Sequence, residues 1–296
     1  MISVRSLLLT ILVILGFISI APGLISDIKK QYKAALEPHS HLAIVKICGE
    51  LNNIDNYVSE LTSYFEDDNI KGILLELDCP GGAAGSSQAL FNEINLLKTD
   101  HPKPVVAVTI NMCASGAYYI ASTANYIVAT PAALVGSIGS FLGYFRVNER
   151  LNKWDIQFME KHSGAYKTII NPFMPSTTEN EALLQTLSDN VYEQFTHDVA
   201  SQRHLSLSEV NQWANGKIFT GEQALKIKLV DELGCKTTAI NKLRELALIK
   251  KEDKIVWIKS KDKEGLINKL IRNQVEPTDL ADLAIQKLKS GFVWIN

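Results

Sequence analysis

The sequence predicts an α/β fold with a parallel sheet, preceded by one membrane-spanning helix. Short apolar runs rich in β-branched residues recur along the chain, as in buried strands. Stretches of helical length separate the first three of these runs, and this alternation is typical of parallel sheets covered by helices. Before them, residues 6–26 contain no charged side chain, and about 20 apolar residues suffice to cross a bilayer as a helix.

The apolar N-terminal segment is either a retained signal anchor or a cleavable signal peptide. Its apolar run is longer than the ~7–15 residues of a signal-peptide core, and no A-x-A-like cleavage site follows it. These features favour an anchor over residues 1–26, followed by a polar linker at 27–41. Arg5 on one side of the segment faces three lysines within 29–33 on the other, so charge alone leaves the orientation open.

The remaining elements follow from apolar runs and helical spacing. The predicted strands are 42–47, 72–77, 104–110, 125–130 and 253–258. Helices are predicted at 55–66, at 85–98 and, as one long amphipathic helix, at 177–203. Two capping-box patterns, Ser206 with Glu209 and Thr220 with Gln223, indicate short helices after it. We therefore expect a main domain at 42–250 and a C-terminal strand with an amphipathic tail at 251–296.

Composition excludes several classes of partner. The 30 Lys and Arg against 32 Asp and Glu give a net charge of −2, so no basic excess indicates nucleic acid. The four cysteines lack C-x-x-C spacing, so we predict no metal site, no cofactor and no disulfide framework. They are interpreted as buried free thiols: Cys48, Cys79, Cys113 and Cys235.

The loop DCPGGAAGSS, residues 78–87, joins a strand to a helix through a Pro-Gly-Gly turn. Glycines leave backbone N–H groups accessible near a helix start, where a developing negative charge is stabilised. The turn is therefore a candidate half of an oxyanion hole, and Gly81, Gly82 and Ala83 are candidate substrate-binding residues. Neither common phosphate-binding glycine pattern is present, and an ordinary strand-to-helix turn is the alternative.

Ser115 lies in MCASGAYYIA, residues 112–121, where small residues connect a strand to a short helix. A nucleophile at this position gains from the positive end of the helix and exposes its Oγ above the sheet edge. The local pattern is not G-x-S-x-G, and a serine that only packs or caps is the alternative. Cys113 has no nearby histidine to activate its thiol, so we interpret it as a packing residue.

A serine nucleophile needs a base, and the sequence favours lysine over histidine. None of the six histidines lies between residues 102 and 161, so a Ser-His-Asp triad has little support. Lys167 lies in HSGAYKTIINPF, residues 162–173, an apolar stretch whose neighbours can desolvate its amine and favour the neutral form. Lys167 is therefore the candidate base, and a solvated loop lysine is the alternative.

Together these segments resemble the bacterial signal peptide peptidase (protease IV-type) family of membrane-anchored serine peptidases. The likeness covers residues 42–245, and the ordered set of motifs is specific although each fragment alone is weak. The matching segments are CPGG at 79–82, ASGAYYIA at 114–121, ATPAALVGSIG at 129–139, SGAYK at 163–167, FTGEQAL at 219–225 and LVDELG at 229–234.

The resemblance implies a Ser-Lys dyad, with Ser115 as nucleophile, Lys167 as general base, and the N–H groups of Gly82 and Ser115 as oxyanion donors. It implies the spiral of parallel strands shared by caseinolytic peptidases and crotonases, and homo-oligomeric rings with grooves between protomers. It also implies extended apolar peptide substrates, such as signal-peptide remnants, and a single-pass plasma or inner membrane protein whose catalytic domain is extracytoplasmic. Whether both dyad residues come from one protomer stays open.

The chain departs from the family pattern at two positions. Cys79 stands before Pro80 where serine is usual, and Ala117 follows Gly116 where a second glycine is commoner.

Two other functions stay open. A crotonase-like acyl-CoA enzyme is one alternative, although no basic cluster near 78–87 suits the CoA phosphates. A non-catalytic membrane scaffold is the other.

Overall fold

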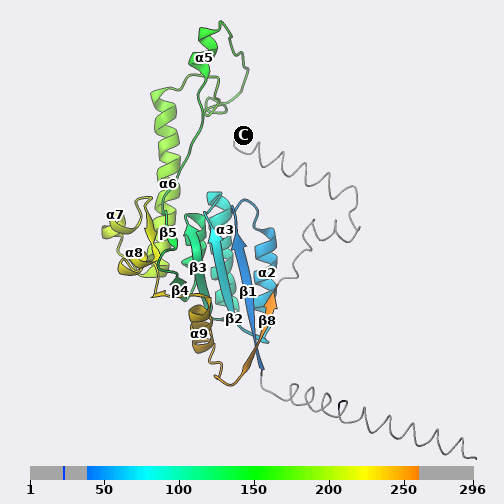
Figure 1. Cartoon of the computed structure of the whole chain (residues 1–296). Coiled ribbons are helices and arrows are strands. Elements are labelled where there is room, and N and C mark those ends of the chain that lie inside the picture. The colour runs from blue at the N-terminus through cyan, green and yellow to red at the C-terminus, as the bar shows by residue number, and fades with distance from the viewer. Residues whose placement is uncertain (1–22, 24–38, 260–296) are drawn as a thin grey trace, which may run out of the picture.

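The computed structural model describes residues 39–259 together with Gly23, and Figure 1 shows their arrangement. The predicted anchor at 1–26 and most of the linker at 27–41 lie outside the described residues, as does the tail after residue 259. Within the described part of the chain, no helix combines the length and the hydropathy needed to cross a membrane.

A largely parallel sheet of eight strands forms the centre of the described region. The strands are β1 (His39–Cys48), β2 (Ile70–Cys79), β3 (Val105–Ala114), β4 (Tyr126–Ala129), β5 (Leu134–Gly136), β6 (Ile218–Thr220), β7 (Glu232–Leu233) and β8 (Lys254–Lys259). Their order is β6-β5-β3-β2-β1-β8, and β4 pairs with β3 and β7. Among these strands every pairing is parallel except that of β5 with β6. The predicted α/β class is confirmed.

Helices pack on both faces of the sheet because successive strand residues point to opposite faces. Leu75 and its neighbours on one face pack with Phe65 of α2 and with α3 and α4. Leu74 on the other face packs with Leu243 of α9. The helical elements are α2 (Asp55–Glu66), α3 (Ala84–Asp100), α4 (Gly116–Ala121), α5 (Asn148–Lys153), α6 (Thr178–Arg203), η1 (Leu207–Glu209), α7 (Val210–Trp213), α8 (Gly221–Lys226) and α9 (Lys236–Leu246).

The last described strand joins the sheet beside the first. β8 pairs in parallel with β1 from His39 opposite Lys254 to Ile44 opposite Lys259. The strand predicted at 253–258 therefore belongs to the same sheet as the main domain, although the sequence suggested a boundary at residue 250.

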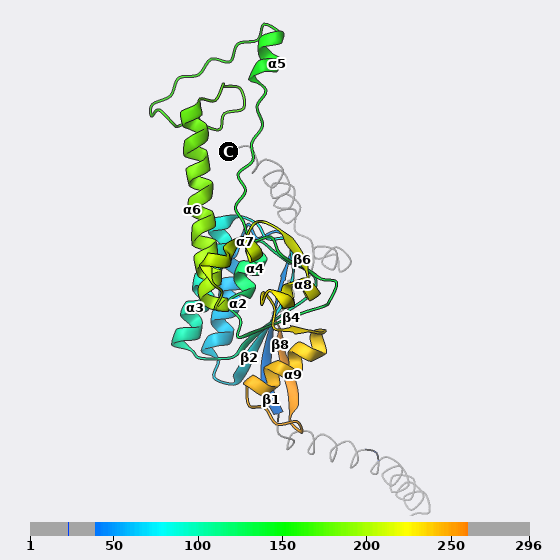
Figure 2. The same cartoon turned by 90° about the vertical axis from the view of Figure 1, so that its left-hand side faces the viewer.

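The long helix α6 is buried only in part. Phe195, Val199 and Ala200 near its C-terminal end lie in the core, whereas Leu187 nearer its start is 51% exposed. The sequence predicted one long amphipathic helix at 177–203, and its extent is confirmed, but the helix does not pack on the sheet along its whole length. The N-terminal half instead projects beyond the sheet, as both views of the molecule show (Figures 1 and 2).

An arm, residues 140–177, connects the end of β5 to the start of α6 and contains α5. It extends with the free half of α6 away from the sheet (Figure 2). Many of its large apolar side chains are exposed, including Phe141, Phe145, Trp154 and Met159. No strand or long helix was predicted in this stretch, and its separation from the core was not anticipated.

Candidate active site

Ser115 lies at the sharp turn where β3 ends and α4 begins. Its backbone has φ 52° and ψ −124°, a conformation that a residue with a Cβ adopts only where its surroundings enforce it. The strand-turn-helix arrangement is that of a nucleophile elbow, which lifts the serine Oγ above the end of the sheet. The strained turn favours the nucleophile over a serine that only packs or caps.

The Pro-Gly-Gly turn packs directly against the turn that carries Ser115. A Cβ on Gly81, which has φ +104°, would come within 2.7 Å of the Ser115 Cβ. A Cβ on Gly116 would come within 2.0 Å of the Ser87 Oγ. Glycine at both positions therefore allows the two turns to approach each other. The structure thus brings the predicted substrate-binding turn and Ser115 together.

The N–H of Gly82 is available to a ligand. Leu51 N donates to Gly81 O at 2.9 Å, and Ala83 N donates to Leu51 O at 3.1 Å. These bonds fix the backbone on both sides of Gly82, whose own N–H has no acceptor among the residues that the structure describes. This geometry suits an oxyanion donor, because a fixed N–H stabilises charge without reorganising.

The N–H of Ser115 does not fit the role of second oxyanion donor. It donates to Gly136 O at 2.7 Å, because β5 runs beside the end of β3. The N–H of Gly116, at the first position of α4, has no acceptor in the described part of the chain, as is usual for the first turn of a helix. The position of a Gly116 Cβ lies 3.5 Å from Gly82 N. Gly116 therefore replaces Ser115 as the candidate donor.

The Cys79 side chain supports the start of the Pro-Gly-Gly turn. Its buried Sγ accepts a hydrogen bond from Gly81 N at 3.3 Å. Burial raises the pKa of the Cys79 thiol and also that of Cys113, its partner in register on β3. Both thiols are therefore protonated at neutral pH, and the interpretation of Cys113 as a packing residue fits its burial.

The other two cysteines correct the prediction that all four are buried. Cys48 and Cys235 are free but exposed. Cys48 is the last residue of β1, and Cys235 precedes the first residue of α9, so both lie at the ends of elements rather than inside the core.

Lys167 does not lie near Ser115 within one chain. It is exposed in the arm, and its neighbour Tyr166 donates a hydrogen bond to Glu179 in the first turn of α6. Tyr119, in the helix that follows Ser115, stacks instead on Phe195 near the other end of α6. At 1.5 Å of rise per residue, Glu179 and Phe195 are about 24 Å apart along the helix.

The apolar surroundings predicted for Lys167 do not form within the single chain. Tyr166 and Phe173, which belong to the apolar stretch 162–173 around Lys167, are 44% and 41% exposed. Neither residue belongs to the described hydrophobic core. A single chain therefore presents the lysine on an open apolar surface.

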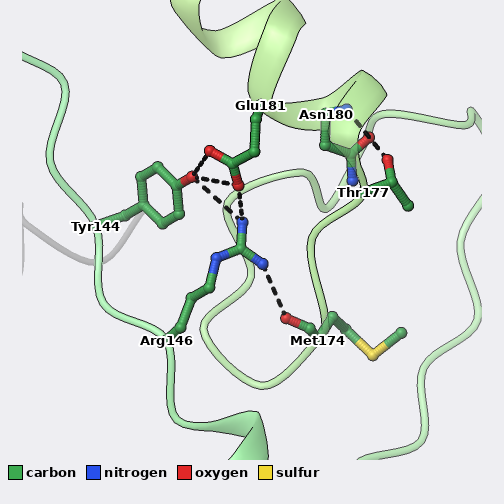
Figure 3. Close-up of polar contacts among 6 residues, drawn as sticks. All are labelled: Tyr144, Arg146, Met174, Thr177, Asn180 and Glu181. Atoms are coloured by element: carbon green, nitrogen blue, oxygen red, sulfur yellow. Dashed lines mark hydrogen bonds and ion pairs between the residues drawn. The ribbon is translucent and has the colours of Figure 1, made fainter.

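A cluster of polar side chains joins the arm to the start of α6 (Figure 3). Glu181 accepts from the Tyr144 hydroxyl at 2.7 Å and from Arg146 Nη2 at 2.7 Å. Arg146 Nη1 also reaches Met174 O at 3.4 Å. The Ser176 hydroxyl, then Tyr144 and Arg146, hold the pKa of Glu181 below its ordinary value. The cluster ties two segments of the arm, one with Tyr144 and Arg146 and one with Met174, to Glu181 of α6, and sequence spacing gave no signal for it.

Tyr119 connects the helix of the nucleophile to α6. Its ring stacks on Phe195 with centroids 4.3 Å apart and lies 4.7 Å from Phe91 of α3. Its hydroxyl donates to Asp198, and burial raises the pKa of Tyr119. The buried end of α6 is therefore fixed to the turn that carries Ser115.

Comparison with known proteins identifies the family. The model of peptidase family S49 matches residues 98–250. A candidate protease of Methanocaldococcus jannaschii is 38% identical over 191 residues, which cover 64% of this chain and 61% of that protein. A candidate protease of Synechocystis is 33% identical over 217 residues, covering 73% and 77%. A candidate signal peptide peptidase SppA of Enterococcus faecium is 30% identical over 196 residues, covering 66% and 57%.

The match thus spans about three fifths of two of these relatives and most of the third. The matched family region contains both Ser115 and Lys167. The resemblance to the signal peptide peptidase (protease IV-type) family is confirmed, and the chain belongs to peptidase family S49.

Proposed function

We propose that this chain is a membrane-anchored serine endopeptidase that cleaves extended apolar peptides, with Ser115 as nucleophile and Lys167 as general base. Membership of family S49 makes it a serine peptidase. The observation that carries the choice of nucleophile is the strained backbone of Ser115 at φ 52°, next to the N–H groups of Gly82 and Gly116, which have no acceptor within residues 39–259.

In the proposed reaction the Ser115 Oγ attacks the carbonyl carbon of the scissile peptide bond. Lys167 takes the hydroxyl proton as the Oγ–C bond forms, and the carbonyl oxygen becomes an oxyanion. The tetrahedral intermediate then expels the amine, which receives that proton from Lys167. Water attacks the resulting ester with Lys167 again as base, and the acid product leaves with Ser115 restored.

The proposed oxyanion hole consists of the N–H groups of Gly82 and Gly116. Each is fixed in place before substrate binds, because the backbone around Gly82 is bonded to Leu51 and Gly116 opens α4. Loss of one such donor typically lowers kcat by about 10²–10³-fold. Substrate would lie beside Gly81, Gly82 and Ala83 as an extended strand, with its side chains in shallow apolar pockets.

Lys167 reaches Ser115, in this proposal, from a second copy of the chain in a homo-oligomeric ring. A distance along α6 supports this arrangement. Tyr166, next to Lys167, bonds to Glu179 at the start of the helix, and this point lies about 24 Å from Phe195, on which Tyr119 stacks. The exposed Phe141, Phe145 and Met159 on the arm supply apolar surface for the contact. Burial in that contact would desolvate the Lys167 amine.

The proposed protein has a spiral fold and a single membrane anchor. We infer the spiral fold of caseinolytic peptidases and crotonases, because β4 and β5 pair with successive parts of β3, Val106–Thr109 and Met112–Ala114. The uncharged segment 6–26 supports a single-pass anchor in the plasma or inner membrane. From the family resemblance we infer an extracytoplasmic catalytic domain that cleaves remnants of signal peptides.

The nucleophile is tested with a serine-directed acylating probe on the full chain. The wild-type protein should be labelled, and mass spectrometry should locate the adduct on Ser115, whereas Ser115→Ala should lose both the label and hydrolysis of a fluorogenic apolar peptide. Lys167→Ala should also lose turnover, while Lys161→Ala, a matched exposed lysine on the same arm, should retain it. Full turnover by Lys167→Ala would exclude this base.

Mixing the two inactive variants tests whether the dyad spans two chains. If Ser115→Ala and Lys167→Ala subunits exchange into one oligomer, a fraction of the sites regains a serine from one chain and a lysine from the next. Recovered hydrolysis supports the shared site. An assembly in which exchange is demonstrated but no activity returns would place both residues in one chain.

A further inference from the structure

Resting on the proposed role of Lys167, we infer that Glu160 is a positioning residue that presets the Lys167 loop, residues 158–173, before any partner binds. Its carboxylate is the centre of the polar contacts inside this loop. It does not touch the reacting atoms in the single chain, and it acts through the backbone that carries Lys167.

Glu160 bonds across the loop with both of its carboxylate oxygens. Oε1 accepts from the Thr168 hydroxyl at 2.8 Å, and Oε2 accepts from Asn171 Nδ2 at 2.8 Å. His162 Nδ1 lies 3.3 Å from Oε1. The Glu160 side chain is only 14% exposed, although most of the surrounding arm is open to solvent. A carboxylate that is withdrawn from water in this way needs the bonds it makes.

Thr168 and Asn171 bracket the segment that follows Lys167 directly. Lys167 N donates to Gly164 O at 3.1 Å, and Asn171 N donates to Thr168 O at 2.9 Å, so a turn lies on each side of the lysine. The bond from Glu160 to Thr168 therefore fixes the residue next to Lys167. This fixes the direction in which the lysine leaves the loop.

The ends of the loop are closed independently of Glu160. The rings of Phe158 and Phe173 lie with centroids 5.1 Å apart, and Val147 N donates to Pro172 O at 2.8 Å. A compact loop with close ends and internal side-chain packing is an Ω-loop, a kind of segment that often carries function. Its ends set where the loop stands, and Glu160 sets its internal shape.

The structure assigns Glu160 a role in turnover because a base must be held close to its productive position. A displacement of about 1 Å can lower the rate of a positioned reaction by about 10²-fold. Without the carboxylate, Thr168 and Asn171 lose their common acceptor, and the backbone of Lys167 gains freedom that assembly must then remove.

The test compares Glu160→Ala, Glu160→Gln, Thr168→Val and the double variant Glu160→Ala/Thr168→Val in the full chain, with hydrolysis of an apolar peptide measured over a range of substrate concentrations. Glu160→Ala should lower kcat by about 10- to 100-fold with KM changed by less than about threefold. Glu160→Gln keeps one acceptor and should recover part of kcat. Thr168→Val should lower kcat less, and its effect should not add to that of Glu160→Ala, because both remove the same bond.

Controls separate this inference from general damage and from the proposed function. Glu149→Ala, which removes another carboxylate from the arm, should leave kcat unchanged, and circular dichroism with size-exclusion chromatography should show an unchanged fold and assembly for every variant. If Glu160→Ala fails to fold, the Thr168→Val result decides. Normal kcat in the Glu160 and Thr168 variants, with Lys167→Ala inactive, overturns the inference. An active Lys167→Ala overturns the proposed function itself.

Discussion

The turn that carries Ser115 and the arm that carries Lys167 are built in opposite ways. Around Ser115 the geometry comes from the backbone, through a positive φ, close glycine contacts and N–H bonds to Gly136 and Leu51. Around Lys167 it comes from exposed or half-buried side chains, with Glu160 and Glu181 as the acceptors. The Ser115 turn is packed within the described core, whereas Lys167 is exposed on the arm.

This difference predicts how strongly substitutions in each region lower activity and stability. A backbone site in a packed core cannot relax when a Cβ is added, so single changes there should be severe. A polar site on the surface loses only part of its order when one contact is removed, because each exposed pair stabilises little. Substitutions at the Ser115 turn should therefore lower activity and stability more than substitutions on the arm.

Gly81→Ala should have the largest effect. Its Cβ would lie 2.7 Å from the Ser115 Cβ, and its φ of +104° is unfavourable for alanine. We expect kcat to fall by about 10²-fold or more, with a loss of about 1–3 kcal/mol in the free energy of unfolding. Peptide hydrolysis and denaturant titration measure the two effects.

Gly85→Ala is the matched control for this prediction. Gly85 lies in the first turn of α3, and a Cβ there would meet nothing within 4 Å. Activity and stability should stay near wild type. Equal losses in the two variants would show that the approach of the Pro-Gly-Gly turn to Ser115 is not the cause.

Arg146→Ala should have a smaller effect that is confined to the arm. The substitution removes the contacts to Glu181 and to Met174 O, so the base of the Lys167 loop should loosen. We expect kcat to fall by about tenfold, with the stability of the sheet changed by less than about 0.5 kcal/mol. Arg150→Ala, on α5 of the same arm, is the control that should leave kcat unchanged. A large drop in global stability would mean that the arm and the sheet are not separate in energy.

The buried Cys79 Sγ tests whether a side-chain contact also supports the Pro-Gly-Gly turn. Cys79→Ser keeps an acceptor for Gly81 N–H and should retain kcat within about threefold, whereas Cys79→Val removes it at a cost of about 1 kcal/mol. That cost corresponds to a loss of about five- to tenfold in kcat if it acts on the oxyanion turn. Steady-state kinetics on both variants decide, and equal activities would show that the Sγ contact is not needed.

Most of the sheet, and the proximity of the Pro-Gly-Gly turn to Ser115, were predictable from sequence. The apolar runs marked β1, β2 and β3, and the helix at 55–66 has the predicted bounds, because periodicity reports burial directly. Gly82 and Ser115 could be placed together because they follow the carboxyl ends of neighbouring parallel strands.

Two features could not be predicted from sequence: the hydrogen bond that occupies the Ser115 N–H, and the exposure of the arm. The bond from Ser115 N to Gly136 O depends on where β5 lies, and no local pattern around Ser115 reports that. In the arm, Phe145 and Trp154 have the composition of core residues, yet they are 82% and 68% exposed. Sequence patterns show that such residues avoid water but not whether their own chain or another one covers them.

The smallest expected effect is a pH dependence of the arm that the nucleophile region does not share. Glu181 has a folded-state pKa below its ordinary value, so its contribution to arm order is present above the ordinary glutamate pKa, about 4.3, and is lost as pH falls through the depressed folded value. Once the slower intrinsic exchange in acid is corrected for, the amide protection factors of residues 140–177 should therefore fall as pH drops through the depressed folded-state pKa of Glu181, before those of β3 do. In Glu181→Gln the arm should already exchange faster at pH 7 and should lack this acid step. An arm that keeps its protection until the sheet unfolds would show that the Glu181 contacts do not hold it, and the contrast between a fixed nucleophile and a separately held lysine would lose its energetic basis.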